Sequence, residues 1–228
     1  MITKICENVY LVGGSDLTDP YDCLIYLVHL DAGAVLIDAG AGCATDRLIE
    51  NIKQTGIEPK KLRAVVLTHC HIDHIGGANE IRKRTGSKIY AHEKDSKAIE
   101  EAIPAFTVEH YYGMALAPIP IDVKLSGEAG KFDFTSDTLE WIHTPGHTPG
   151  SIAVMYKNPA GETVLFGQDI HGPFEPGFGS NITDWRNSMK KLLDLKPDIL
   201  CEGHFGIFRP ADEVRRFIET HLKRYSRR

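Results

Sequence analysis

Short apolar runs alternate with amphipathic stretches along the first half of the chain. The apolar runs are typical of strands, and the stretches with apolar residues at helical spacing are typical of helices. A glycine stands just past two of these helices, as is common at helix C-termini. The predicted strands cover residues 8–12, 23–30, 34–37, 64–68 and 88–91, and the predicted helices cover residues 44–55, 75–85 and 92–101.

The second half contains more strands in succession, separated by Gly, Pro or Asp turns. The predicted strands cover residues 123–125, 131–134, 139–143, 151–156, 163–166 and 199–201, and the predicted helices cover residues 184–195 and 210–224. Because strands follow one another without helices between them, two mixed sheets with helices outside fit better than a doubly wound parallel sheet. We therefore expect an α/β protein in which residues 1–228 form a single domain.

Residues 103–121 interrupt this rhythm with three prolines and an aromatic group that includes Tyr111 and Tyr112. Linkers are poor in large apolar residues, so we predict that this segment is either a lid or an excursion of the chain that forms an interface with another subunit. An interface would make the protein a homodimer. The alternative is a plain connecting loop with a short helix of its own.

Composition excludes several classes of protein. The 26 basic and 31 acidic residues give a net charge of −5, whereas a nucleic-acid partner would require a basic face. No run approaches eighteen apolar residues, so no membrane span is expected. The N-terminus lacks the apolar block of a signal peptide, and the five cysteines are odd in number and form no CxxC pair. These features predict a cytoplasmic protein with reduced thiols.

The densest group of chemically active residues lies in residues 68–77, which read THCHIDHIGG. Side chains alternate along an extended backbone, so His69 and His71 are expected to point to the same side. Asp73 and His74 begin the following helix and can point elsewhere. One short segment therefore offers nitrogen and oxygen ligands to two adjacent metal centres, a mixture that suits zinc and also iron or manganese.

Three further residues occupy similar places in the chain. His147 lies in the loop HTPGHTPGS, Asp169 follows the apolar run that begins at Val164, and His204 follows residues 199–203. Each lies where a buried strand emerges into a loop that contains glycine. Ligands at strand ends are the usual arrangement in layered α/β folds, so we predict that all these residues share one site.

The pattern resembles the metallo-β-lactamase superfamily from about Asn8 to Pro210. The resemblance rests on the strand end LIDAG at residues 36–40, the HxHxDH motif, the Pro-Gly-His loop, the later aspartate and the final Gly-His. It implies an αββα sandwich of two mixed β-sheets flanked by helices, with a two-metal site in the cleft between the sheets. It also implies a structural role for Asp38 beneath the site.

The resemblance assigns the metal ligands residue by residue. The ligands of one ion would be His69, His71 and His147, those of the second would be Asp73, His74 and His204, and Asp169 would bridge the two. The cofactors would be two Zn²⁺ per chain, with iron or manganese as alternatives. Two ions roughly 3.5–4 Å apart lower the pKa of a shared water toward 7 and provide a bridging hydroxide. Asp73 would act as a catalytic residue that relays the proton.

The members that look closest are glyoxalase II and lactone hydrolases, because both keep the residues that match Asp73 and Asp169. We therefore expect a metallohydrolase acting on a small ester-like substrate, a lactone or a thioester. Only 24 residues follow His204, too few for the helical domain that grips glutathione in glyoxalase II, so a glutathione thioester is not expected. The candidate pocket residues come from residues 103–121 and 171–179 and are Tyr111, Tyr112, His171 and Phe174.

Two alternatives remain open at this stage. Persulfide dioxygenases share the fold but bind a single iron through positions that match His69, His147 and Asp169. A non-catalytic binding protein with the same fold is the other alternative. The identity and number of metal ions per chain would distinguish these from a dinuclear hydrolase.

Overall fold

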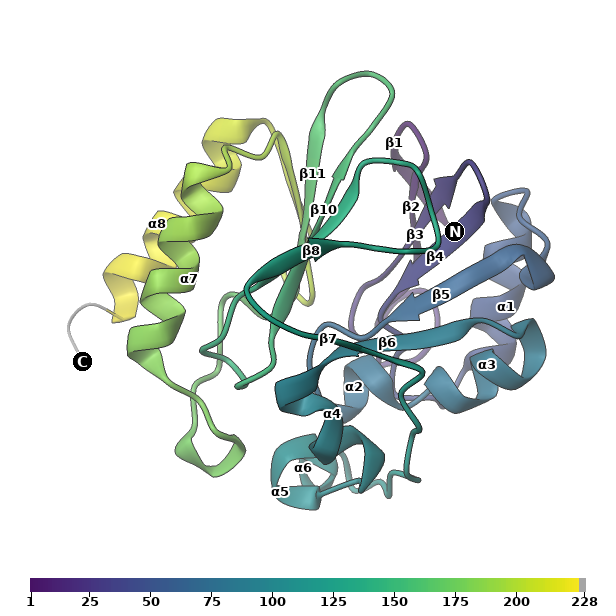
Figure 1. The fold of residues 1–228 in the computed structure, drawn as a ribbon, viewed down its shortest axis with the longest axis horizontal. Helices are drawn as coiled ribbons and strands as arrows, with labels where there is room; N and C mark the ends of the chain where they lie inside the picture. Colours follow the sequence, from purple (N-terminus) through teal and green to yellow (C-terminus); the bar gives the residue numbers. More distant parts are fainter. Residues whose placement is uncertain (226–228) are drawn as a thin grey trace.

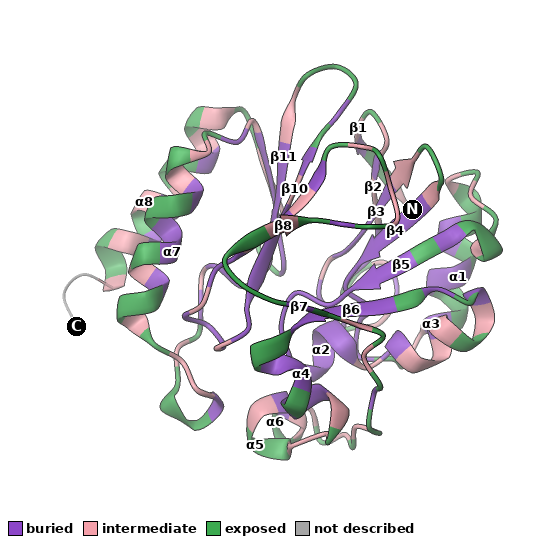
Figure 2. Ribbon diagram, in the orientation of Figure 1, coloured by how far each residue is buried: buried purple, intermediate pink, exposed green. Residues whose placement is uncertain are grey.

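Two β-sheets pack face to face in the computed structural model, which describes residues 1–225, and helices cover the outer side of each sheet (Figure 1). This arrangement confirms the predicted αββα sandwich. Strands are buried along most of their length, whereas the outward faces of the helices are exposed (Figure 2). The described helices include none that is long and apolar enough to cross a membrane.

The first sheet has seven strands whose spatial order follows the chain. The strands are β1 (Thr3–Cys6), β2 (Val9–Gly13), β3 (Ile25–Leu30), β4 (Gly33–Ile37), β5 (Leu62–Val66), β6 (Lys88–His92) and β7 (Val123–Leu125). Neighbours from β1 to β4 are antiparallel, and neighbours from β4 to β7 are parallel. The parallel strands need crossover connections, which supply the helices on this side.

The second sheet has six strands in the order β13-β12-β11-β10-β9-β8. They are β8 (Ala129–Lys131), β9 (Leu139–His143), β10 (Ile152–Lys157), β11 (Thr163–Gly167), β12 (Ile199–Glu202) and β13 (Ile207–Phe208). Only β11 and β12 are parallel, and the crossover between them contains the long helix α7 (Ile182–Asp194). The carboxyl ends of β11 and β12 therefore lie side by side.

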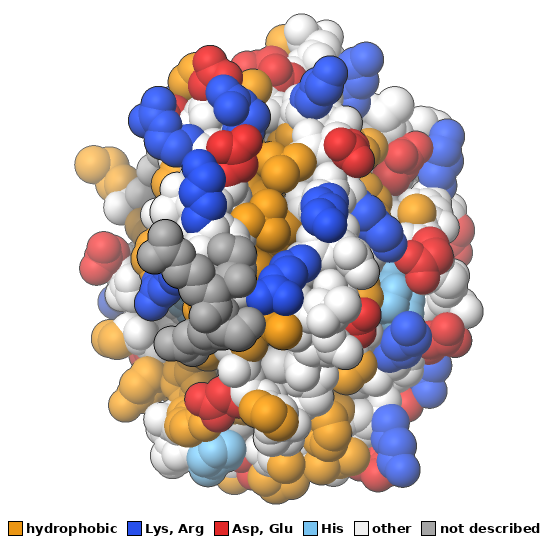
Figure 3. All heavy atoms as spheres, turned by 90° about the vertical axis from the view of Figure 1, so that its left-hand side faces the viewer, with side chains coloured by type: hydrophobic (Ala, Val, Ile, Leu, Met, Phe, Trp, Pro, Cys, Tyr) orange, Lys and Arg blue, Asp and Glu red, His pale blue; other side chains and the backbone are white. Residues whose placement is uncertain are grey.

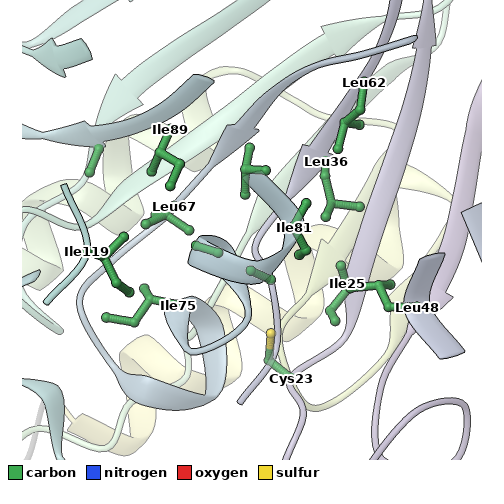
Figure 4. Close-up of a cluster of buried hydrophobic side chains, with 14 of the residues drawn as sticks. Cys23, Ile25, Leu36, Leu48, Leu62, Leu67, Ile75, Ile81, Ile89 and Ile119 are labelled. Carbon is green, nitrogen blue, oxygen red and sulfur yellow. The ribbon is translucent and has the colours of Figure 1, made fainter. Parts of the chain in front are cut away.

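Three apolar clusters hold the layers together. Between the sheets, side chains such as Val35 and Val66 of the first sheet pack with Val154 and Phe166 of the second. On the outer side of the first sheet, Leu48 of α1 (Thr45–Gln54) and Ile81 of α3 (Ala78–Thr85) are buried against strand residues such as Leu36 and Ile89 (Figure 4).

The outer side of the second sheet is covered by α7 and by α8 (Ala211–Tyr225), through residues such as Trp185 and Ile218. The surface of this face carries Lys, Arg, Asp and Glu side chains around a band of apolar ones (Figure 3). Arginines of α8 pair with acidic residues of the same helix, as in Arg215 with Asp212 and Arg216 with Glu213. The basic composition of the last helix is thus largely balanced within it.

Residues 103–121 contain two four-residue helices, α5 (Pro104–Thr107) and α6 (Glu109–Tyr112). They follow α4 (Glu93–Glu100) and lie below the first sheet in the view of Figure 1.

Several predicted boundaries were wrong. The expected helix 75–85 is two helices, α2 (Ile72–Ile75) and α3, separated by Gly76 and Gly77. A Cβ at either glycine would collide with the backbone carbonyl of Ala41 or Ala39, so the close approach of the loop after β4 requires glycine at both positions. The strand expected at residues 131–134 is β8 and ends at Lys131. The short edge strands β1 and β13 were missed.

Candidate metal centre

Four of the predicted site residues lie between β5 and the end of α2. His69 and His71 belong to the loop, Asp73 and His74 belong to α2, and all four are at least 95% buried. His71 keeps an extended backbone and α2 begins at the next residue, so the chain turns between the two pairs. The amide of Ala39 donates a hydrogen bond to the carbonyl of His74 (2.7 Å), which holds α2 against the loop after β4.

The other three site residues come from the second sheet. His147 lies in the loop between β9 and β10, Asp169 lies two residues past β11, and His204 lies two residues past β12. Asp169 has a left-handed backbone with φ of 52°, a strained conformation for a residue other than glycine. Gly203 lies so near that a Cβ there would collide with the Asp169 carboxylate, so this position needs a glycine.

His69, His71 and His147 form one group, the three-histidine cluster. One ligand atom from each of them and one from Asp169 lie within 4.8 Å of one another. The Nε2 atom of His147 is 3.0 Å from Nδ1 of His71 and 3.4 Å from Oδ2 of Asp169. Three imidazoles and a carboxylate oxygen at this spacing can surround a single ion.

Asp73, His74 and His204 form a second group, the aspartate–histidine cluster, whose ligand atoms also lie within 4.8 Å of one another. The Oδ2 atom of Asp73 is 3.3 Å from Nε2 of His74 and 3.2 Å from Nε2 of His204. The structure thus brings all seven predicted ligands together, in the two sets that the resemblance implies.

Asp169 divides its two carboxylate oxygens between these clusters. Its Oδ2 faces His147 and, at 3.8 Å, Nε2 of His69. Its Oδ1 is 3.4 Å from Nε2 of His74 and 3.2 Å from Nε2 of His204. One carboxylate therefore reaches both clusters at once.

The chemistry of these donors fits metal ions. Nε2 of His69, Nε2 of His74 and Oδ1 of Asp169 are buried without a hydrogen-bond partner among the described residues. Buried polar atoms are normally satisfied, and convergent unsatisfied nitrogen and oxygen atoms are what a cation site requires. These residues fit a His/Asp metal centre.

The two clusters hold their imidazoles in different charge states. Burial lowers the pKa of His69, His71 and His147, so these rings are neutral, the form that binds metal. Burial also opposes protonation of His204, but the carboxylates of Asp169 and Asp73 outweigh it and raise the pKa of His204 to about 10.

Contacts behind the ligands fix their orientation. Asp38, at the end of β4, accepts hydrogen bonds from Nδ1 of His74 and from the amide and hydroxyl of Thr68, each at 2.8 Å. Nδ1 of His147 donates to the carbonyl of Pro173 (2.8 Å). Because Nδ1 is occupied in both histidines, Nε2 is left free to bind metal. Asp38 thus lies beneath the site, where the resemblance expects it.

A family model described as the metallo-beta-lactamase superfamily matches residues 18–204, most of the chain and every residue of both clusters. The chain belongs to the metallo-β-lactamase superfamily.

Two bacterial proteins illustrate the sequence similarity of this chain to other superfamily members. The probable metallo-hydrolase YflN of Bacillus subtilis is 29% identical over 212 residues, covering 79% of each chain. The hydroxyacylglutathione hydrolase GloC of Haemophilus influenzae is 26% identical over 195 residues, covering 82% of this chain and 86% of that protein. Membership of the superfamily, relatives named as metallo-hydrolases and the His/Asp clusters together support a metal-binding hydrolase.

Solved structures agree on the fold. BJP-1, a subclass B3 metallo-β-lactamase of Bradyrhizobium japonicum, is similar with a TM-score of 0.82 at 21% identity, covering 99% of this chain and 92% of that one. At this identity the likeness describes the metallo-β-lactamase fold alone.

A cleft of about 420 Å³ opens over the metal centre of this superfamily member. Of the predicted pocket residues, Tyr111, Tyr112 and His171 line it, together with the predicted ligands His71, Asp73, Asp169 and His204. Phe174 does not line it, because its ring packs against Trp185 and Tyr225, with centroids 4.9 Å and 4.8 Å away. Sequence reasoning missed Val108, Pro173 and Phe178, although all three lie in the two segments expected to provide contacts.

Two buried carboxylates that support the site were also missed. Glu202 accepts hydrogen bonds from Nδ1 of His171 (2.6 Å) and from the amide of His204 (2.8 Å). Asp95 accepts hydrogen bonds from the hydroxyl of Thr148 and the amide of Gly150, both 2.6 Å, and so anchors the loop that carries His147. Glu202 directly precedes the Gly203-His204 pair in the sequence. This position is the one sequence signal that could have indicated its supporting role.

Proposed function

We propose that the chain is a dinuclear metal-dependent hydrolase of a small ester-like substrate, a thioester or a lactone, working in the cytoplasm. The observation that carries the proposal is Asp169, whose two oxygens face two complete sets of ligands. A single-iron triad of His69, His147 and Asp169 would leave His71, His74 and His204 without a role.

The name of one relative favours thioesters. GloC is called a hydroxyacylglutathione hydrolase, and this chain matches 86% of its length. The expectation that chain length disfavours a glutathione thioester therefore loses its basis, because a protein matched over most of its length carries that name. Thioesters are the first class to test.

Divalent ions in such a centre supply a hydroxide nucleophile at neutral pH and polarise the bond under attack. The protein residues do the remaining work. His71 and Asp169 line the reacting end of the cleft, and His69 and His147, held by Thr68 and by the carbonyl of Pro173, lie beside them. Asp73 lines the cleft with its Oδ2 beside His204, a position from which it can hold the proton passed to the leaving group.

The deciding experiment is elemental analysis of protein purified without added metal, followed by assays with a thioester and a lactone. We expect two ions per chain and hydrolysis that is lost on chelation and restored by zinc. His29→Gln, which changes a β3 histidine outside both clusters, is the control and should keep both ions. One iron per chain with oxygen uptake on a thiol-derived substrate would replace the proposal with a dioxygenase. An inert protein after reconstitution would indicate a binding protein.

A further inference from the structure

Exposed aromatic side chains gather at the mouth of the cleft. Among the described residues, the strongly exposed large apolar side chains are Met1, Tyr21, Tyr111 and Phe205, the last three at 50–60% exposure. Tyr111 lines the cleft itself. Large apolar side chains that stay this exposed, where they lie together, are typical of a surface that binds an apolar ligand.

The other two aromatics adjoin the same opening. Tyr21 lines a recess of about 130 Å³ that shares Tyr112 and His204 with the cleft. The ring of Phe205 lies 4.6 Å from the ring of His171, a wall residue of the cleft. Tyr111 thus lines the cleft, and Tyr21 and Phe205 each contact a residue that lines it, Tyr112 and His171 respectively. We call these three exposed side chains the aromatic rim.

Neither the cleft nor the recess is lined by Lys or Arg from the described part of the chain. Acidic groups are present instead. Asp22 lines the recess, and the exposed Glu175 accepts a hydrogen bond from the hydroxyl of Tyr111 (2.8 Å) at the rim. A carboxylate or phosphate on the distal part of a substrate would find no lysine or arginine from the described residues there and would be repelled by Glu175.

Polarity within the cleft changes from the floor to the mouth. The floor consists of metal ligands, and one wall carries His171, held by Glu202. The remaining lining residues are Val108, Pro173 and Phe178, which are apolar, and Tyr111 and Tyr112, whose rings each carry a hydroxyl. The reacting bond belongs at the polar floor and the body of the substrate lies against apolar walls and the aromatic rim.

We infer that the substrate is an ester, thioester or lactone whose body is uncharged and apolar, so that a glutathione thioester is a poor substrate. The inference rests on the proposed hydrolase function and narrows its substrate class. It separates this chain from the relative named as a hydroxyacylglutathione hydrolase, since glutathione bears two carboxylates that the rim cannot pair.

Two thioesters with the same acyl group test the inference on the metal-loaded enzyme. One carries glutathione as the thiol and the other carries uncharged N-acetylcysteamine. We expect kcat/KM to be at least about tenfold higher for the uncharged thioester, a difference of about 1.4 kcal/mol. Equal rates, or faster cleavage of the glutathione thioester, would overturn the inference and leave the hydrolase function standing. Hydrolysis of neither thioester, nor of a lactone, would overturn the proposed function and the inference with it.

Calorimetry gives a second readout that does not depend on turnover. The probes are two thioethers, S-octyl-N-acetylcysteamine and S-octylglutathione, which cannot be hydrolysed. We expect the uncharged thioether to bind more tightly by at least about tenfold. Tighter binding of S-octylglutathione would contradict the inference.

Adding a cation to the rim should shift the preference. Tyr111→Lys and Phe205→Lys are expected to lower KM for the glutathione thioester relative to the uncharged one. Gln54→Lys, which makes the same charge change on the exposed end of α1, is the matched control and should leave the preference unchanged. An equal shift of the substrate preference in all three variants would show that net charge causes the effect, and would contradict a specific role for the aromatic rim.

Discussion

The three-histidine cluster and the aspartate–histidine cluster share Asp169 but surround their imidazoles differently. In the first cluster, His69 and His147 have a hydroxyl and a backbone carbonyl as their outer partners. In the second, His74 contacts Asp38 and Asp73, and His204 contacts Asp73. In the first cluster, burial outweighs the Asp169 carboxylate and keeps His69 and His147 neutral, whereas at His204 the carboxylates of Asp169 and Asp73 outweigh burial and keep the ring protonated.

The clusters also differ in exposure. Every histidine of the three-histidine cluster is at least 95% buried, whereas the side chain of His204 is 35% exposed. A metal ion entering the second cluster has to displace protons and meets a ligand open to water. The first cluster is therefore the better preformed half, and the second depends more on its supporting carboxylates. The following variants test this difference, from the largest expected effect to the smallest.

Asp169→Ala removes the one residue common to both clusters. We expect metal content to fall from two ions per chain to at most one, and kcat to fall by roughly 10³-fold, the size of effect seen when a single preorganised electrostatic group is removed. Elemental analysis and initial rates measure both. Full activity in this variant would refute the bridging assignment.

His69→Ala and His204→Ala compare the clusters directly. His69→Ala removes one of the three imidazoles from the better preformed cluster and leaves the aspartate–histidine cluster, which we expect to bind its ion less tightly. After dialysis we therefore expect this variant to lose more metal than His204→Ala. His204→Ala should retain about one ion per chain, because the three-histidine cluster is intact. Equal metal loss in the two variants would contradict the distinction between the halves.

Asp38→Asn tests the dependence of the second cluster on its support. The amide cannot hold His74 as a carboxylate does, and loss of such an outer partner typically lowers metal affinity about 10–100-fold. Asp22→Asn is the matched control, since Asp22 is also buried and hydrogen bonded but accepts from the amide of Ala41. Competition with a chromogenic chelator measures both affinities. Similar weakening in the two variants would indicate a general effect of burying an amide.

His92 shows what burial does to a histidine outside the metal centre. Its ring stacks on His143 with centroids 4.1 Å apart, and Nε2 donates to the carbonyl of Gly127 (3.1 Å). Burial lowers the pKa of His92. The unfolded chain therefore binds a proton near pH 6.5 that the folded chain does not, and stability falls as pH decreases below this value, by up to about 1.4 kcal/mol per unit.

His92→Asn removes this titration while keeping an acceptor at the start of α4, where Nδ1 of His92 accepts from the amide of Lys94. We expect the variant to lose less thermal stability than the parent between pH 7 and pH 5. Thermal unfolding of both metal-free proteins at several pH values measures the difference. Identical pH dependence would show that burial of this ring does not set its charge.

Local sequence pattern was sufficient for much of the molecule. Apolar runs indicated the central strands because a strand covered on both faces has to be apolar at nearly every position. The ligands could be identified because each lies just after such a run, where a strand meets a loop. The failures are equally physical. Gly76 and Gly77, which lie between α2 and α3, have to be glycine because backbone carbonyls more than thirty residues earlier approach them closely, which no local pattern reports.

The pocket shows the same limit. Phe174 and Phe178 are four residues apart in one loop and look alike in the sequence, yet Phe174 packs under the loop and Phe178 lines the cleft. Glu202 supports His171 from a strand thirty-one residues away. Such contacts depend on where α7, α8 and the second sheet place the loop.

The sequence by itself determined the residue types at the metal centre, their positions at strand ends and the layered class of fold, because these follow from local periodicity and donor chemistry. Only the tertiary structure decided that the two oxygens of Asp169 face different clusters, and that no lysine or arginine of the described residues lines the cleft. The physical reason is that a side chain's direction at a loop is set by packing between two sheets. The residues that pack there, such as His69 and Asp169, are a hundred positions apart in the chain.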